Sequence, residues 1–98
     1  MTTFVLLSKV SSEGIRHVRS LIEMDKEFDA QLKNQCPEVR RLGSYALLGA
    51  YDFLHIFEAA DAREAAKVAL IANSFGVTST QTLTAIPFIE FREIVEEL

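Results

Sequence analysis

The sequence predicts a single α+β domain with elements in the order βαββαβ, followed by a short helix. Three observations lead to this prediction. Apolar residues alternate along four short segments, amphipathic helical patterns follow the first and third of them, and a turn at residues 49–52 joins the second to the third. A chain of 98 residues has the length of one domain. We place the domain in residues 1–86 and treat residues 87–98 as a helical extension.

The first predicted strand covers residues 3–9 and is apolar on both faces. Phe4 and Leu6 point to one side, whereas Val5 and Leu7 point to the other. A strand of this kind belongs to a sheet that is covered on both faces. Because one layer of helices covers only one face, we expect a second subunit to cover the other.

The first helix is expected to begin near Ser11, whose hydroxyl can cap it, and to end near Cys36, before Pro37. Its apolar stripe combines Ile15, Val18, Leu21, Ile22, Phe28 and Leu32.

The next two strands are predicted over residues 39–49 and 53–60, with a bulge at Gly43. The short turn between them makes an antiparallel hairpin. Phe53, His55 and Phe57 then share one face, while Leu54, Ile56 and Glu58 share the other.

The second helix begins at Asp61, with Glu64 completing a capping box, and ends at Gly76. Residues 77–86 form the fourth strand, in which threonines alternate with other residues. Pro87 then suits the first position of a last helix. Its apolar stripe consists of Phe88, Phe91, Ile94, Val95 and Leu98. A helix of about eleven residues is marginal alone in water, so it must dock on its own domain or on a neighbour.

Composition and charge exclude several classes of protein. The formal net charge is −4 and the basic residues are dispersed, which argues against binding to nucleic acid or to an anionic membrane. No apolar run reaches the length of about 18 residues that a membrane span needs, and the N-terminus does not read as a signal peptide. Cys36 is the only cysteine, so no intrachain disulfide is possible and a cytoplasmic location fits best.

The βαββαβ order is the ferredoxin-like plan, and four segments resemble the GYD-domain family, named for a Gly-x-Tyr-Asp turn. They are SEGIR at 12–16, LGAYD at 48–52, EAAD at 58–61 and TQTLTA at 80–85. Tyr45 also sits where the family often has an aromatic residue. The resemblance covers residues 3–86 and implies a dimeric α+β barrel of largely uncharacterised function. The chain departs from it at Ser79 and Thr84, where members often have arginines, and the helix after Pro87 looks like an addition.

Four residues are candidates for chemistry, and each has a structural alternative. Tyr51 and Asp52 present a phenol and a carboxylate at a turn, but Asp52 can equally cap the hairpin while Tyr51 packs over the sheet edge. His55 is the best acid–base candidate because histidine titrates near neutral pH; it can also be a satisfied, partly buried residue. His17 faces a cavity by analogy with other dimeric barrels, or lies on the surface.

Three functional hypotheses follow. The first is an oligomeric binding protein whose small-molecule site is lined by Tyr45, Tyr51, Phe53, His55, Phe57 and His17. The second is a cofactor-free monooxygenase- or isomerase-like enzyme with His55 or Asp52 as base and Tyr51 or Tyr45 as hydrogen-bond donor. The third is an interaction module that assembles through residues 87–98. No metal-ligand spacing or cofactor motif occurs, and we rank binding above catalysis because no acid–base pair is placed on one face.

Overall fold

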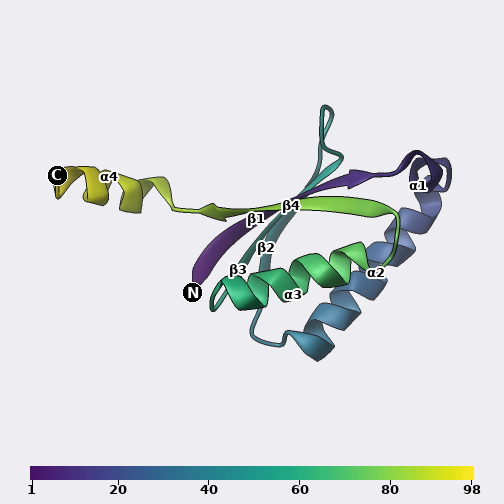
Figure 1. The fold of residues 1–98 in the computed structure, drawn as a ribbon, viewed down its shortest axis with the longest axis horizontal. Helices are drawn as coiled ribbons and strands as arrows, with labels where there is room; N and C mark the ends of the chain where they lie inside the picture. The colour runs from purple at the N-terminus through teal and green to yellow at the C-terminus, as the bar shows by residue number, and fades with distance from the viewer.

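The computed structural model describes all 98 residues and has a four-stranded antiparallel sheet in the order β2-β3-β1-β4. Two long helices, α2 and α3, lie on one side of this sheet (Figure 1). The elements are β1 (Thr2–Val10), α1 (Ser12–Arg16), α2 (Val18–Gln35), β2 (Arg40–Ala46), β3 (Phe53–Ala59), α3 (Ala62–Asn73), β4 (Thr78–Ala85) and α4 (Phe88–Glu96). The predicted α+β, ferredoxin-like fold is confirmed.

The strand register assigns each side chain to one face of the sheet. Leu6 of β1 pairs with His55 of β3 and with Thr82 of β4, and this set points toward the helices. The neighbouring residue Val5 pairs with Ile56 and points to the outer face. The apolar outer face predicted from β1 is therefore present, and no helix of the chain covers it.

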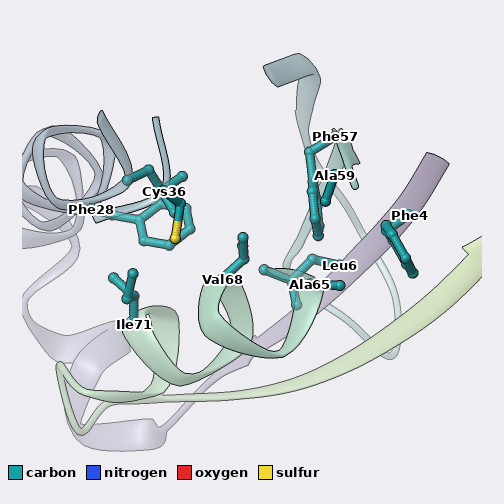
Figure 2. Packing of buried hydrophobic residues seen from close by; sticks show 10 residues of the cluster. Phe4, Leu6, Phe28, Cys36, Phe57, Ala59, Ala65, Val68 and Ile71 are labelled. Carbon is teal, nitrogen blue, oxygen red and sulfur yellow. The ribbon is translucent and has the colours of Figure 1, made fainter. Parts of the chain in front are cut away.

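The core lies between the sheet and the two long helices. Leu6 and Phe57 lie toward Val68 of α3 there (Figure 2), and the Phe4 ring stacks on Phe57 with a centroid distance of 5.6 Å. The remaining members of the buried cluster are Phe28, Leu32, Cys36, Ala59, Ala65 and Ile71. Burial raises the pKa of the Cys36 thiol, which keeps this cysteine protonated and unreactive.

The bulge predicted at Gly43 is confirmed, because the pairing of β2 with β3 shifts between Arg41 and Gly43. The strand itself is shorter than predicted and ends at Ala46 rather than at residue 49. The chain then leaves the sheet and returns at Phe53 through a hairpin loop whose tip extends away from the body (Figure 1). The Asp61 cap on the amide of Glu64 is as predicted. The helix α3 ends at Asn73, three residues before the predicted stop at Gly76, which has φ +80°.

The first helical region differs from its prediction. The sequence predicts a single helix up to Cys36, but the chain bends at His17, with φ −116° and ψ 50°, and divides into α1 and α2. Close packing holds the first turn: Gly14 is buried, and a Cβ atom on it would lie 2.7 Å from Val10 Cγ1 and 3.1 Å from Val77 Cβ. The amide of Gly14 also donates to Ser11 Oγ at 3.0 Å, the predicted cap.

The last helix, α4, stands apart from the domain. It extends from the end of β4, at the opposite end of the molecule from α1 (Figure 1), and all its residues are exposed. Phe88 is 73% exposed and Phe91 is 48% exposed. None of the helices combines the length and the hydropathy that crossing a membrane requires.

The Gly14 packing generates a stability prediction. Gly14→Ala places a methyl group against Val10 and Val77, and we expect it to lower the free energy of unfolding by about 1–2 kcal/mol despite alanine's higher helix propensity. Urea denaturation measures the change. Gly43→Ala is the matched control: its Cβ would meet only the Tyr45 ring, at 3.4 Å, and we expect a change within about 0.5 kcal/mol. Equal losses in both variants would contradict the role assigned to Gly14.

Candidate functional site

A cleft of about 380 Å³ lies between α2 and the helix-facing side of the sheet. We call it the α2 cleft. It exists because α2 packs into the core only through its C-terminal half, where Phe28 and Leu32 are buried. In the N-terminal half, Val18 and Ile22 are 60% and 63% exposed. The lining residues are Leu6, Ser8, Val10, Val18, Leu21, Ile22, Met24, Asp25, Phe28, Phe53, His55, Ala72, Phe75 and Thr78.

His55 is the only imidazole in this lining, and β3 places it on the floor of the α2 cleft. Its Nδ1 atom lies 2.9 Å from Ser44 Oγ and 3.2 Å from Arg41 Nη2. The ring is tilted against Phe28, with a centroid distance of 6.1 Å. Burial lowers the pKa of His55, the positive charge of Arg41 lowers it further, and Asp25 partly opposes both. The imidazole is therefore neutral at neutral pH.

Arg41 connects β2 to α2 beside His55. Its guanidinium lies 5.3 Å from the centroid of the Phe28 ring, a cation–π contact. It pairs with Asp25 Oδ1 at 3.2 Å and with Asp29 Oδ1 at 3.4 Å, carboxylates one helical turn apart. The Arg41 side chain is only 20% exposed, so these contacts lie partly out of solvent.

Lys33 extends this network along α2. Its ammonium pairs with Asp29 Oδ2 at 2.9 Å. The hydrogen bond from Lys33 and the contact with Arg41 hold the pKa of Asp29 below its ordinary value, against the effect of burial. The arrangement fixes Arg41 and leaves no excess positive charge, since two cations meet two carboxylates.

The structure brings some of the predicted site residues together and separates others. Phe53 and His55 line the α2 cleft, whereas Phe57, on the same face, is sealed in the core. Tyr45 pairs with Leu54 on the outer face of the sheet and is exposed. His17 is exposed at the bend between α1 and α2 and is not part of the lining. The ligand-binding and catalytic roles assigned to these residues stay predictions.

Asp52 has a structural task, but not the local cap of the hairpin considered from the sequence, because its side chain binds β1. The last residue pair between β1 and β3 is Ser8 with Phe53, yet β1 continues to Val10. Asp52 supplies hydrogen bonds to the end of β1 that β3 does not reach. Its amide donates to the Ser8 carbonyl at 2.8 Å, and its Oδ2 accepts from the Val10 amide at 2.7 Å. A hydrogen bond to a charged group of this kind contributes roughly 1.5–3 kcal/mol.

Tyr51 lies away from the α2 cleft. Its hydroxyl donates to the side-chain carbonyl of Gln81 on β4. The two residues border a second, polar depression together with Lys9, Ala50, Ser79 and Thr80. The structure therefore does not bring Tyr51, Asp52 and His55 to one place, although they are close in sequence.

Sequence reasoning missed Arg41, Ser44 and Asp25 as neighbours of His55. For Ser44 the sequence did contain an indication, the glycine that marks the bulge. The bulge at Gly43 sets the register that brings Ser44 opposite His55. For Arg41 and Asp25, the sequence pattern indicates only charged residues of solvated surfaces. No group of three or more His, Cys, Asp or Glu side chains is placed to hold a metal ion. Chemically, the α2 cleft offers an apolar enclosure with one neutral imidazole and a fixed ion-pair network beside it.

Comparisons with known proteins identify relatives. A family model described as the GYD domain matches residues 4–95. A protein of Thermus thermophilus, described as "Glutamine synthetase and cystathionine beta-lyase binding protein", is 38% identical over 87 residues, which cover 89% of this chain and 90% of the relative. No solved structure matches the chain. The domain boundary placed at residue 86 stays a prediction.

The neighbours of His55 generate a prediction for its titration. In a His17→Gln background, NMR should show the His55 ring titrating below 6.5, and Arg41→Gln should raise that pKa because a positive neighbour is lost. The folded state binds this proton less tightly than the unfolded chain does. The contribution of neutral His55 to the free energy of unfolding is therefore fully present above pH 6.5 and decreases as the pH falls below that value.

Arg40→Gln is the control for this titration. Arg40 pairs with Glu58 on the outer face, at 3.6 Å, and should leave the pKa of His55 unchanged. An equal shift in both variants would show that Arg41 acts through overall charge rather than through its contact with the ring.

Proposed function

The chain belongs to the GYD-domain family, and on that premise we propose that it is a binding protein whose α2 cleft holds a small, largely apolar molecule. The observation that carries this proposal is the cleft lining, in which ten of 14 residues are hydrophobic. Apolar surface that stays open to water is unfavourable by roughly 25 cal/mol per Å², so an apolar ligand is stabilised when it covers that surface.

The size and the polar content of the α2 cleft support a small-molecule site. A volume of about 380 Å³ falls within the range of roughly 300–1,000 Å³ typical of such sites. These sites combine an apolar lining with a few polar groups that orient the ligand. Ser8, Asp25, His55 and Thr78 are the polar residues here.

The catalytic alternative has weaker support. An enzyme of the proposed kind needs a base and a hydrogen-bond donor that face the same substrate. Asp52 is engaged with the amide of Val10, and Tyr51 reaches Gln81 across the other side of the sheet. Only His55 of the candidate catalytic residues lines the α2 cleft.

We also propose that a second copy of the chain covers the outer face of the sheet. Val5, Leu7, Leu54 and Ile56 form an apolar patch at its centre, and Leu83 extends it onto β4. These residues remain partly accessible in the single chain, and Leu83 is exposed. Self-association would bury this patch and leave the α2 cleft open on the opposite face.

A second candidate function, protein–protein interaction, rests on α4. This helix presents Phe88, Phe91, Ile94, Val95 and Leu98 to solvent and contacts no other element substantially. The Thermus thermophilus relative is described as binding two enzymes, glutamine synthetase and cystathionine β-lyase. We propose that α4 docks on a further copy of the chain and so builds the larger assembly on which such binding depends.

Ligand binding in the α2 cleft is tested by filling it. Ala72→Leu adds three carbon atoms to the lining, and we expect it to weaken binding of the uncharged fluorescent probe N-phenyl-1-naphthylamine at least fivefold, which is about 1 kcal/mol. Ala30→Leu makes the same change on the exposed side of α2 and should leave the affinity unchanged. Undiminished binding to Ala72→Leu would mean that the probe sits elsewhere.

The role of α4 is tested by assembly size. Truncation after Ile86, or Phe91→Ser in the full chain, should lower the oligomeric state measured by light scattering after size-exclusion chromatography, because both remove apolar contact surface. Glu93→Ser, on the charged side of the same helix, is the control and should assemble as the unmodified chain does. If the truncated protein keeps its assembly size, α4 does not build the oligomer.

A further inference from the structure

The contacts of His55 decide which of its ring nitrogens carries the proton. Nδ1 has two neighbours, Arg41 Nη2 at 3.2 Å and Ser44 Oγ at 2.9 Å. A guanidinium has donors only and no acceptor, so Nδ1 must be the acceptor in the contact with Arg41. In a neutral imidazole the proton then resides on Nε2.

Ser44 is consistent with the same assignment. Arg41 Nη2 also donates to Ser44 Oγ, at 3.0 Å, which leaves the serine proton free to point at Nδ1. Arg41 Nη2 also lies 3.2 Å from Asp25 Oδ1, so its two hydrogens are shared among three acceptors, and the lone pair of Nδ1 is shared between the donors of Arg41 and Ser44. The opposite tautomer would set the N–H of Nδ1 against the N–H of Arg41, which is repulsive.

The other ring nitrogen has no partner in the protein. None of the hydrogen bonds of the chain involves His55 Nε2, and no buried side-chain nitrogen or oxygen is left without a partner, so Nε2 reaches accessible space. We infer that this space is the α2 cleft, because His55 is part of its lining. The cleft therefore contains an unused N–H donor in a mostly apolar lining, where Ser8 is a further polar residue whose hydroxyl has no partner in the chain.

The charges around the α2 cleft disfavour an anion. Arg41 is the cation that contacts His55, and its charge is matched by Asp25 and Asp29, while Lys33 matches the remaining carboxylate charge. Asp25 itself belongs to the lining. A carboxylate ligand would give up its hydration, meet no free positive charge and face the carboxylate of Asp25.

We infer that the α2 cleft selects uncharged, largely apolar molecules with one hydrogen-bond acceptor, such as a ketone, ester or quinone oxygen, which accepts the proton of His55 Nε2–H. This inference rests on the proposed ligand-binding function and names the class of ligand. The lowered pKa of His55 supports it, since a neutral ring keeps a single donor at neutral pH.

Three naphthalenes of similar shape test the inference. 2-Acetylnaphthalene has a neutral acceptor, 2-ethylnaphthalene has none, and 2-naphthoate has a charged one. With the full chain at pH 7.5, we expect the ketone to bind about three- to tenfold more tightly than the hydrocarbon, the gain of one net hydrogen bond. The carboxylate should bind most weakly of the three.

His55→Phe removes the donor but keeps an aromatic ring of similar size, and it should bring the affinities for ketone and hydrocarbon close together. His17→Phe is the matched control at the exposed bend and should preserve the preference. Nitrogen-15 NMR of the unmodified protein supplies a readout that needs no variant: Nε2 should have the shift of a protonated nitrogen, and Nδ1 that of an unprotonated one.

The outcomes separate the inference from the proposed function. If hydrocarbon and ketone bind the unmodified chain equally well, or if Nδ1 carries the proton, the ligand class is wrong while the cleft remains a binding site. If none of the three compounds binds, the ligand-binding function fails and the inference fails with it.

Discussion

The position of Phe28 is the constraint on which the rest of this molecule depends. Phe28 is buried with Leu32 and fixes the C-terminal half of α2 against the sheet. The same ring contacts the guanidinium of Arg41 and lies against the imidazole of His55. One side chain thus belongs both to the core and to the wall of the α2 cleft, so core packing positions the polar groups at its edge. The rest of α2 stands away from the sheet and leaves the cleft open.

The two faces of the sheet differ in how far the chain itself covers their apolar residues. On the helix-facing side, α2 and α3 cover the core residues almost completely, and the α2 cleft is the place where they do not. On the outer side nothing from the same chain covers the apolar residues of β1 and β3. Because these surfaces lie on opposite sides of the sheet, assembly through one need not obstruct ligand entry through the other. The exposed stripe on α4 is a third surface, separated from both.

Much of the fold could be predicted from the sequence because it depends on local rules. Alternation along residues 53–57 placed Phe53, His55 and Phe57 on one face, the Asp61 cap marked the start of α3, and Gly43 marked the bulge. Recognition of the GYD-domain family from four short segments was also correct. These features need only the spacing of neighbouring residues and the backbone preferences of glycine and aspartate.

The site was less predictable because it depends on long-range geometry. The neighbours of His55 come from β2 and α2, and their approach requires the exact offset of the bulge as well as the tilt of the helix. The bend at His17 was missed because the close approach of Gly14 to Val10 and Val77 arises only when β1 and β4 are paired. A helical pattern that continues through residues 15–22 gives no sign of it.

The bond between the Asp52 carboxylate and the Val10 amide changes what the motif at residues 49–52 signifies. The carboxylate takes the place of a missing backbone partner where β1 outlasts its neighbour β3. In this chain the aspartate of the turn therefore sets how far the first strand reaches, and it takes no part in the α2 cleft. Residues of the cleft lining can change, and the ligand with them, while this bond and the scaffold that it holds stay the same.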